Sequence, residues 1–500
     1  MQLSDYLKCD ATALAQNIAA GDVTPQELLA CALEQSARVN PKTNAICRLM
    51  EAEARTQLRQ RPQGPFAGVP FLIKDSLQDY AGLLTSGGSK SMLKVVPKEH
   101  ASVVRRYLGA GLVIFGKTNL PEFALKAVTD SALFGVTSNP WDLTRTPGGS
   151  SGGAAAAVAS GVVPMAAGND GGGSLRIPAS YCGLFGLRPS RGRISAGPAT
   201  GEVWSGASSE GVISRSVRDS ARALDILHGA EPGDPFEIQR PSRSYEECLL
   251  QAPGQLRIGF CSTSPIGTPV HPHAVAAVAD AVALLQSLGH TVDEVASPVD
   301  GTALSMSYLH MYFGHVSASV QQARSAGAKA QDFELLTRVI ATLGDATSSG
   351  AFVREVSAWN SYARALGAFH GKYDLLLTPT VATPAPVHGA TDLPKAQEWA
   401  LSALERTGLM RGLAGLGLLD GVTKQIAKDS LTFVPFTQLA NLTGTPAMSV
   451  PLYWSPDGLP MGVQFVAKFG KEDQLLQLAG QLEESRPWMH RQPSLVAALK

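Results

Sequence analysis

The sequence predicts an α/β protein: a single large domain, residues 1–500, in which helices cover both faces of a mixed central β-sheet. Segments with the apolar spacing of a helix alternate with short apolar runs typical of buried strands, and glycines separate the two kinds. The apolar runs recur from about residue 70 to residue 466, so we expect one sheet to collect strands from most of the chain. Fifty glycines and 32 prolines indicate many shaped turns, which suit a scaffold with a pocket better than a helical bundle.

The first elements are helical. Residues 3–39 are expected to form two helices, because Thr24 is a good N-cap, Pro25 suits the first helical position and an acidic residue follows in the first turn. A further helix is expected at 101–108, and a buried strand at 112–115 follows it after a glycine turn.

Later segments repeat this order of helix, glycine and strand. Helices are expected at 152–160 and 273–288, and strands at 162–167, 291–295, 375–377, 447–452 and 462–466. Residues 229–256 are polar and proline-rich, so we expect them to cross the surface. Residues 300–430 are rich in Ser, Ala and Gly with scattered aromatics, and we expect an irregular, variable insertion or lid that shapes a substrate pocket.

Composition excludes several classes of partner. Lys plus Arg equals Asp plus Glu at 42 each, so no net field attracts nucleic acid or an anionic membrane. The six cysteines stand far apart with no CxxC spacing, which indicates free thiols and no metal site. The first residues lack the pattern of a signal peptide, so a cytoplasmic protein is expected. Whether the chain forms a homodimer is left open.

Two motifs suggest other chemistry. Residues 111–118 (GLVIFGKT) match the phosphate-loop pattern, but the four residues between the glycines are strand core and suit no exposed cradle. Residues 148–152 (GGSSG) match the nucleophile elbow of Ser-His-Asp hydrolases, but turn residues precede them where that elbow needs a strand. A nucleotide-binding protein and a Ser-His-Asp esterase are therefore retained only as alternatives.

A second glycine-serine cluster follows the expected strand 162–167 directly. In GNDGGGSLRIPA, residues 168–179, Ser174 lies at the carboxyl end of that strand, where ligands of α/β sheets usually bind. The glycines 171–173 leave backbone N–H groups unshielded, and an oxyanion hole needs such donors beside a nucleophile. A plain glycine-rich turn is the alternative interpretation of the cluster.

Lys74 is the candidate base. It ends the apolar run Val69 to Ile73, so burial can strip water from its amine, lower its pKa and make the neutral amine available. An ordinary lysine at a strand end that faces water is the alternative for this residue taken alone.

Taken together, these motifs resemble the amidase signature hydrolases. The resemblance rests on GVPFLIKDS, GKTNLPEFA, GGSSGGAAAAVASG and GNDGGGSLRIPASYCGLFGLRPSRGR, which occur in the family's order. The dense part spans residues 64–218, the expected catalytic core, and weaker echoes occur at 375–380 (LLLTPT) and 436–451 (FTQLANLTGTPAMSVP). The amidase signature fold is thereby implied for the whole chain.

The resemblance also implies roles for residues. It makes Ser174 the acylated nucleophile and Ser150, on a cis peptide bond from Gly149, the bridge that passes a proton to Lys74. It makes the amides of Gly171, Gly172, Gly173 and Ser174 the oxyanion hole. Supporting roles fall to Ser151, Asp170 and Arg176, and the candidate pocket residues are Tyr308, Phe313 and Trp359. The implied reaction is hydrolysis of a carbon–nitrogen bond through an acyl-enzyme, with no cofactor.

One departure from the family bears on the substrate. Many relatives carry Thr or Ile where this chain has Gly171, and Ser or Thr where it has Asn169. Gly-Gly-Gly here, and the later run GEVWSG at 201–206, also occur in relatives resembling 6-aminohexanoate cyclic dimer hydrolase. The expected substrate is therefore a small aliphatic or aryl amide, a nylon-type oligomer or a carbamate. The A subunit of a tRNA-dependent amidotransferase, a glutaminase, is the alternative within the family, and a non-catalytic binding module is a further one.

Overall fold

The computed structural model describes residues 1–410, 413 and 430–497. Its strands are β1 Ile46–Leu49, β2 Pro70–Lys74, β3 Val113–Thr118, β4 Asp130–Ser131, β5 Gly135–Val136, β6 Met165–Asp170, β7 Phe185–Arg188, β8 Ser209–Ser214, β9 Arg257–Phe260, β10 Thr291–Glu294, β11 Leu375–Pro379, β12 Ala447–Trp454 and β13 Pro460–Ala467. Eight of them form the main sheet in the order β10-β9-β11-β13-β12-β7-β8-β6. The neighbours from β10 to β11 are parallel and all the others antiparallel, so the sheet is mixed, as predicted.

The strand that ends at Lys74 belongs to a different sheet. β2 pairs in parallel with β3, and β3 pairs with β1, which makes a separate three-stranded sheet. We expected these strands in the main sheet. Instead β2 packs beside the edge strand β6, and side chains rather than a backbone ladder join the two sheets there. This seam between two sheets is where the candidate base lies.

Helices cover both faces of the main sheet, as predicted. Their bounds are α1 Leu3–Tyr6, α2 Ala11–Ala20, α3 Pro25–Thr43, α4 Glu51–Arg59, α5 Ser102–Gly109, α6 Gly152–Ala159, α7 Arg176–Cys182, α8 Val217–Leu227, α9 Tyr245–Leu249, α10 Pro272–Ser287, α11 Gly301–Ser325, α12 Leu335–Ala346, α13 Ser349–Phe369, α14 Lys395–Arg406, α17 Gln438–Thr443, α18 Glu472–Ser485 and α19 Ser494–Ala497. α7, α13 and α17 pack on one face, and α8, α10 and α18 pack on the other. The result is one α/β domain.

Most predicted elements are present, with shifted ends. The helix expected at 152–160 is α6, and the strand expected at 162–167 begins three residues later, as β6. The N-terminal part has a third, short helix, α1, and Thr24 caps α3 through a capping box with Glu27. The expected surface crossing at 229–256 also contains α9.

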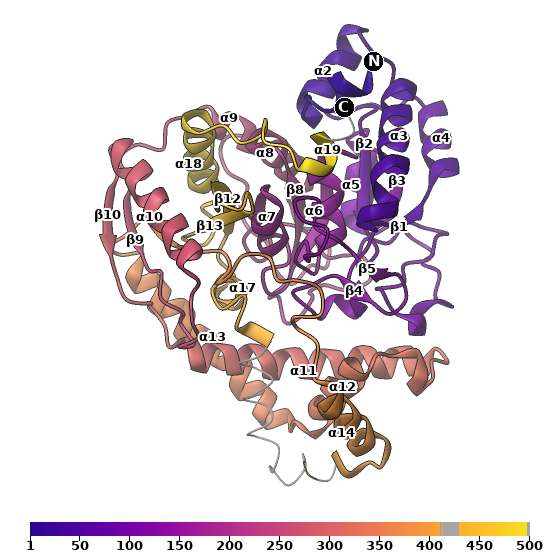
Figure 1. Cartoon of the computed structure of the whole chain (residues 1–500), viewed down its shortest axis with the longest axis vertical. Coiled ribbons are helices and arrows are strands. Elements are labelled where there is room, and N and C mark those ends of the chain that lie inside the picture. The colour runs from indigo at the N-terminus through magenta and orange to yellow at the C-terminus, as the bar shows by residue number, and fades with distance from the viewer. Residues whose placement is uncertain (411–412, 414–429, 498–500) are drawn as a thin grey trace.

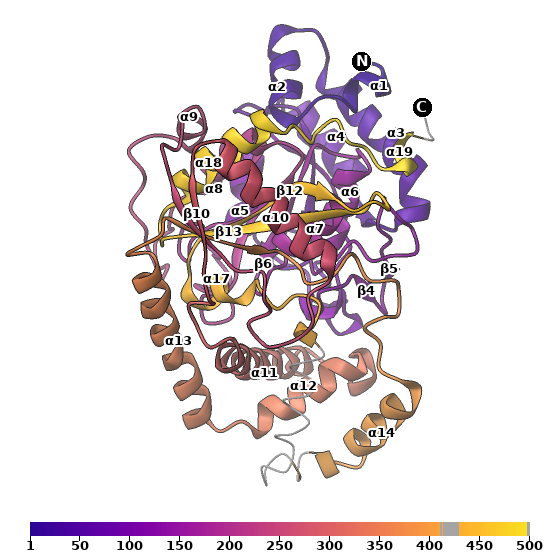
Figure 2. The same ribbon diagram turned by 60° about the vertical axis from the view of Figure 1, so that its left-hand side comes forward.

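The expectation of an irregular segment at 300–430 was wrong for its described part. Residues 301–325, 335–346, 349–369 and 395–406 are helical, and Figures 1 and 2 show α11 to α14 gathered at one end of the molecule. Alanines and apolar residues at helical spacing outweigh the scattered Ser and Gly. Asp300 caps α11 by accepting hydrogen bonds from Thr302 N and Ala303 N. Residues 411–412 and 414–429 of the expected lid lie outside the described residues.

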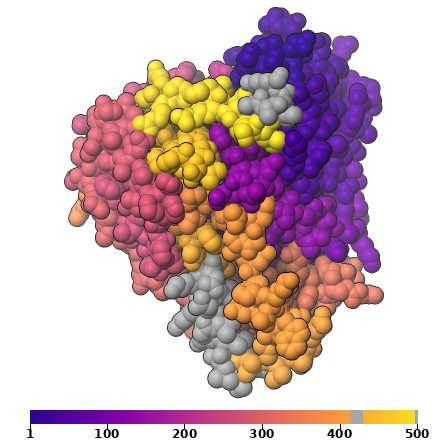
Figure 3. All heavy atoms as spheres, in the orientation of Figure 1, coloured from indigo at the N-terminus to yellow at the C-terminus, as the bar shows by residue number. Residues whose placement is uncertain are grey.

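Different parts of the chain cover different parts of the outer surface (Figure 3). In the surface view the N-terminal part of the chain, indigo to purple, forms one flank, and α14, in orange, lies at the lower end (Figure 3). Within the part of the chain that the structure describes, we find no helix of the length and apolar character needed to cross a membrane.

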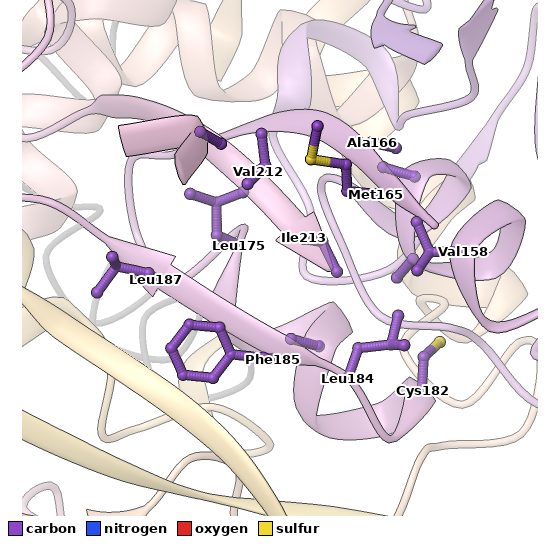
Figure 4. Close-up of a cluster of buried hydrophobic side chains, with 14 of the residues drawn as sticks. Val158, Met165, Ala166, Leu175, Cys182, Leu184, Phe185, Leu187, Val212 and Ile213 are labelled. Carbon is purple, nitrogen blue, oxygen red and sulfur yellow. The ribbon is translucent and has the colours of Figure 1, made fainter. Parts of the chain in front are cut away.

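The main core draws on most of the chain, and the part of it between β6, β7 and β8 and the helices beside them anchors the predicted nucleophile (Figure 4). Leu175, the residue after Ser174, is fully buried in this core (Figure 4). Side chains at Gly168 and Gly211 would each come within 2.8 Å of the Leu175 methyl groups, and one at Gly186 would come within 2.8 Å of its carbonyl oxygen. Glycines on three strands therefore leave the space that Leu175 fills.

Candidate active site

Lys74 lies at the seam between the two sheets with its side chain fully buried. Its Nζ is 2.7 Å from Ser150 Oγ, 3.1 Å from Ser151 Oγ and 2.6 Å from Asn169 Oδ1. The alternative of an ordinary lysine that faces water was therefore wrong. Three segments far apart in the chain, at residues 74, 150–151 and 169, meet at this amine.

The loop before α6 presents the two serines to Lys74. The peptide bond between Gly149 and Ser150 is cis, as the resemblance implied. The backbone of residues 127–128 passes close by, so that a side chain at Gly149 would lie 2.5 Å from Val128 O. Only glycine fits there without moving that backbone. Ser151 precedes α6, and its hydroxyl also donates to Asn169 O at 3.3 Å.

Burial changes the charge state of the lysine. Loss of water lowers the pKa of Lys74 to about 7, although the carboxylates of Glu210 and Asp170 act in the opposite direction. An ammonium on Lys74 would donate hydrogen bonds to Ser150, Ser151 and Asn169. A neutral amine has two N–H bonds, which fit Asn169 Oδ1 and one serine, and its lone pair then accepts a hydrogen bond from the other hydroxyl. The site can therefore hold a neutral amine against Ser150.

Ser174 lies in the turn between β6 and α7. It is partly exposed, unlike the buried Lys74, Ser150 and Ser151, and its side chain makes no hydrogen bond with any residue that the structure describes. Its neighbour Leu175 fixes the turn from inside the core. Ser174 is thus a partly exposed hydroxyl next to a residue that is anchored in the core.

The glycine run before Ser174 carries backbone donors. Within the described residues, the amides of Gly171, Gly172 and Ser174 have no hydrogen-bond partner. The amide of Gly173 differs, because it donates to Asp170 Oδ1 at 2.7 Å. The run therefore offers three unpartnered donors and one that is already bound.

Asp170 and Arg176 hold this turn from behind. Arg176 donates to the Asp170 carboxylate through Nε at 2.9 Å and Nη2 at 2.8 Å, and both side chains are fully buried. Burial alone would raise the pKa of Asp170, but the Arg176 charge and hydrogen bonds bring that pKa well below its usual range. The carboxylate stays ionised and fixes the loop through Gly173 N and Leu175 N.

Several residues at the site were missed from the sequence. Asn441 donates to Asp170 Oδ1 at 2.9 Å, and Thr437 and Gln438 donate to Gly172 O. All three lie in or just before α17, within the FTQLANLTGTP segment, which the sequence singled out as a family echo without assigning roles. Gln78 and Glu210 lie next to Lys74, and neither belongs to a motif that could have revealed it.

Aromatic rings lie against the glycine run. The Tyr308 hydroxyl occupies the space that a side chain at Gly172 would need, and the Trp204 ring does the same at Gly171. Tyr312 packs against both rings, with centroids at 6.0 Å and 5.3 Å. Of the three candidate pocket residues, the structure brings only Tyr308 to the glycines.

The other two candidates lie in different surroundings. Phe313 is buried in the core among the helices α11 to α13, where its backbone oxygen contacts Gly344. The Trp359 ring lies under the Arg191 guanidinium, whose carbon is 5.5 Å from the ring centroid. Neither residue is among the nearest neighbours of a side chain built at Gly171, Gly172 or Gly173.

The phosphate-loop match has a structural explanation. Lys117 lies in β3, buried, where Nζ donates to Leu84 O at 2.8 Å and Thr85 Oγ1 at 2.7 Å and pairs with Asp75 at 3.3 Å. A strand with its lysine bound to protein acceptors makes no phosphate cradle. Within residues 1–410, 413 and 430–497, no three His, Cys, Asp or Glu side chains gather as metal ligands.

Known proteins resemble this chain over nearly its full length. The Amidase family model matches residues 27–408 and 419–476. The 6-aminohexanoate-cyclic-dimer hydrolase of Paenarthrobacter ureafaciens is 36% identical over 97% of each chain, and an acylamidase of Rhodococcus erythropolis is 32% identical over 98% of each. The structure of 6-aminohexanoate cyclic dimer hydrolase complexed with substrate superposes with a TM-score of 0.89, over 98% of this chain and 99% of that one, at 36% identity. The chain therefore belongs to the amidase signature family and is an amide hydrolase.

Proposed function

We propose that this enzyme cleaves its amide through a triad of Ser174, the cis-linked Ser150 and Lys74, and that it forms an acyl-enzyme on Ser174. The observation that carries the proposal is the buried Lys74 amine, 2.7 Å from Ser150 Oγ, with its pKa lowered to about 7 by burial. A general base works best when its pKa lies near the working pH. Histidine is not needed for this chemistry.

In the acylation step, Ser174 Oγ attacks the amide carbonyl carbon. Its proton goes to Ser150 Oγ, while the Ser150 proton goes to the lone pair of Lys74, which becomes an ammonium. The carbon–nitrogen bond then breaks as the relay returns one proton to the leaving amine. Water attacks the resulting ester by the same relay and releases the acid, so that Lys74 ends each cycle neutral.

The tetrahedral oxyanion requires hydrogen-bond donors. We assign these to the amides of Gly171, Gly172 and Ser174, because no residue of the described chain occupies them. Gly173 was also expected to donate, but its amide would first have to leave Asp170. We therefore give Gly173 the task of holding the turn, with Asp170, Arg176 and Ser151 in support.

The proposed substrates are small aliphatic or aryl amides, nylon-type oligomers and carbamates. The first relative is named for hydrolysis of the 6-aminohexanoate cyclic dimer, and the second is an acylamidase. The apolar surface of Tyr308 and Trp204 beside the glycine run suits an alkyl or aryl chain. Gly171 leaves room for this surface, where a larger residue would not.

The glutaminase alternative, the A subunit of an amidotransferase, is less favoured. The two relatives reported above, at 36% and 32% identity, are named as a cyclic-dimer hydrolase and an acylamidase, and neither name is that of an amidotransferase subunit. An enzyme of that alternative class would release ammonia from L-glutamine and would depend on partner subunits. The lid role of 300–430, a homodimer and a cytoplasmic location stay predictions.

Covalent labelling tests the proposal directly. The full-length protein is incubated with a fluorophosphonate, and the modified peptide is identified by mass spectrometry. We expect an adduct on Ser174, no adduct in Ser174→Ala, and labelling slowed by about 10²–10⁴-fold in Lys74→Met and Ser150→Ala. Lys90→Met, which removes an exposed lysine, is the matched control and should label normally.

A substrate panel completes the test. It contains the cyclic and linear dimers of 6-aminohexanoate, an aryl acylamide, an aryl carbamate and L-glutamine. Turnover of any of the first four that is lost in Ser174→Ala supports the proposal. An unlabelled Ser174, or turnover that survives its replacement, would refute the triad, and glutamine hydrolysis alone would favour the alternative.

A further inference from the structure

A buried carboxyl lies beside the candidate base and takes no part in the proposed relay. Glu210 is on β8, 7% exposed, directly opposite Asn169 of β6 in the antiparallel ladder. Residues opposite each other in such a pair have Cβ atoms about 4.5–5.5 Å apart and share a face of the sheet. Since Asn169 Oδ1 accepts a hydrogen bond from Lys74 Nζ, Glu210 lies on the same side as that amine.

Two amide side chains lie beside both this carboxyl and the lysine. Gln78 Oε1 accepts from the backbone N–H of Lys74 at 2.6 Å, and its Nε2 donates to Glu210 Oε2 at 2.6 Å and to Gly168 O at 3.2 Å. Asn169 binds Lys74 Nζ with its oxygen, and it lies directly opposite Glu210 across the β6–β8 ladder. The backbone of Lys74 is thus linked to the carboxyl group through Gln78, and its amine is bound by the residue opposite Glu210.

Few charged groups surround Lys74 and Glu210. The negative charges of Glu210 on β8 and Asp170 on β6 act on Lys74 and raise its pKa. Asp170 is already neutralised by Arg176, whereas the charge that acts on Glu210 is that of Lys74. The Tyr107 phenol of α5 donates to Gly211 O at 3.4 Å and is neutral, because burial and the Glu210 charge hold its pKa well above the usual value.

Burial shifts both groups toward their neutral forms. Loss of water raises the pKa of Glu210 to about 7, despite the hydrogen bond from Gln78 and the charge of Lys74, and it brings the pKa of Lys74 to about 7 from the other side. A pair of this kind holds one proton near neutral pH, on the amine or on the carboxyl. With the proton on Glu210, the amine is neutral and both groups are uncharged.

We propose that Glu210 is a positioning residue for Lys74: its carboxyl holds the amine in place through Gln78 and Asn169 and shares one proton with it. This inference rests on the proposed function, in which Lys74 is the base. When Glu210 is ionised, it also stabilises the ammonium that forms on Lys74 as Ser150 delivers its proton. Glu210 does not touch the reacting atoms and acts only through the lysine.

Glu210→Gln tests the inference, because the amide keeps the shape and removes the charge. Without that charge the ammonium of Lys74 is less stable. We expect the pH at which the rate falls on the acid side of the profile (the acid limb) to shift to a lower pH by about 1 unit. The plateau rate should fall by about 3- to 10-fold, since a less basic amine is a weaker base. The measurement is the second-order rate of Ser174 phosphonylation from pH 5 to 9, with kcat/KM on the best amide beside it. Glu202→Gln, which neutralises an exposed glutamate in the same segment, is the control and should keep the wild-type profile.

The outcomes separate this inference from the proposed function. An acid limb that stays in place or moves up in Glu210→Gln, while wild-type Ser174 still labels, overturns the role of Glu210 and leaves the triad standing. A wild-type enzyme whose Ser174 never labels overturns both. If Glu210→Gln does not fold, Glu210→Asp replaces it: the shorter carboxyl loses Gln78, so the limb should move down by a smaller amount, and an unmoved limb again refutes the inference.

Discussion

Gly171 and Trp204 are in direct contact: a methyl group on the α-carbon of Gly171 would lie 2.7 Å from Cε3 of the Trp204 ring. The ring also meets Tyr312 edge to face, with centroids 5.3 Å apart. The glycine therefore decides how closely an aromatic wall approaches the proposed oxyanion donors. The residue at position 171 is small because a tryptophan uses the space that a side chain would need.

The first prediction concerns this contact. Gly171→Ala should displace the Trp204 ring and destabilise the fold by about 1–3 kcal/mol, the usual cost of overpacking. It should also lower kcat/KM more for aryl or cyclic amides than for acetamide. Urea denaturation and a comparison of these substrates would measure both effects.

Gly367→Ala is the matched control for that prediction. Gly367 lies in the helix α13 with nothing within 4 Å of an added methyl group. Alanine there should stabilise the protein by about 0.5–1 kcal/mol, because it favours the helix. If Gly171→Ala behaved like this control, the tryptophan contact would have no energetic consequence.

The second prediction is a pH profile. The proposed base is active when neutral, and the pKa of Lys74 is lowered to about 7 by burial, so log(kcat/KM) should fall as the pH drops below about 7 and level off above it. The residual activity of Lys74→Met should show no such limb. A wild-type rate that is flat from about pH 6 to 9 would contradict the assignment of Lys74 as the base.

The third prediction concerns the anchor of the nucleophile. Leu175→Ala should lower the free energy of unfolding by about 2–5 kcal/mol, since the buried side chain fills a closed space against Gly168 and Gly211. Ser174 should lose its fixed position, so kcat should fall more than KM changes. Leu250→Ala serves as the control, because Leu250 is 84% exposed and its loss should change stability by about 0.5 kcal/mol or less.

The sequence pointed to candidate site residues only where they lie in contiguous motifs. Lys74, Ser150 and Ser174 were singled out because each lies in a run of small or apolar residues, and the structure places Lys74 against Ser150. Glu210 could not be found, because only long-range packing brings it to Gln78 and Lys74. Gln78 follows Lys74 by four residues, but no motif marks it as a partner of the lysine. A lone polar residue in a strand or loop carries no local signal of the partner it will meet.

The fold, like the site, could be predicted only in part from the sequence. Apolar runs and glycine turns located β6, β10, β11, β12 and β13 of the main sheet, but β7, β8 and β9 were missed. They also could not show that β2 and β3 form a sheet of their own, because pairing depends on long-range contacts. The described helices of 301–406 were missed since serines and glycines hid an apolar spacing such as Leu304, Tyr308 and Met311. Tertiary packing there outweighed composition.

The fourth prediction concerns the buried ion pair of Asp170 and Arg176. Asp170→Asn leaves the Arg176 charge buried without its carboxylate, which typically costs about 3–5 kcal/mol. The amide would also face the donors Gly173 N and Leu175 N with one oxygen in place of two. Asp293→Asn is the control: its pair with Arg257 is exposed to solvent, so its loss should change stability far less than the loss of the buried pair.

The pH dependence of that loss distinguishes the ion pair from a simple packing defect. The pKa of Asp170 in the folded chain lies below its usual range, because the Arg176 charge and hydrogen bonds outweigh burial. Its contribution is therefore complete above the unfolded pKa of about 4 and is lost as the pH falls toward the folded value. The stability difference between wild type and Asp170→Asn should be constant from pH 6 to 8 and shrink below about pH 4. A difference that stays constant in acid would mean that shape, and not charge, is what Asp170 supplies.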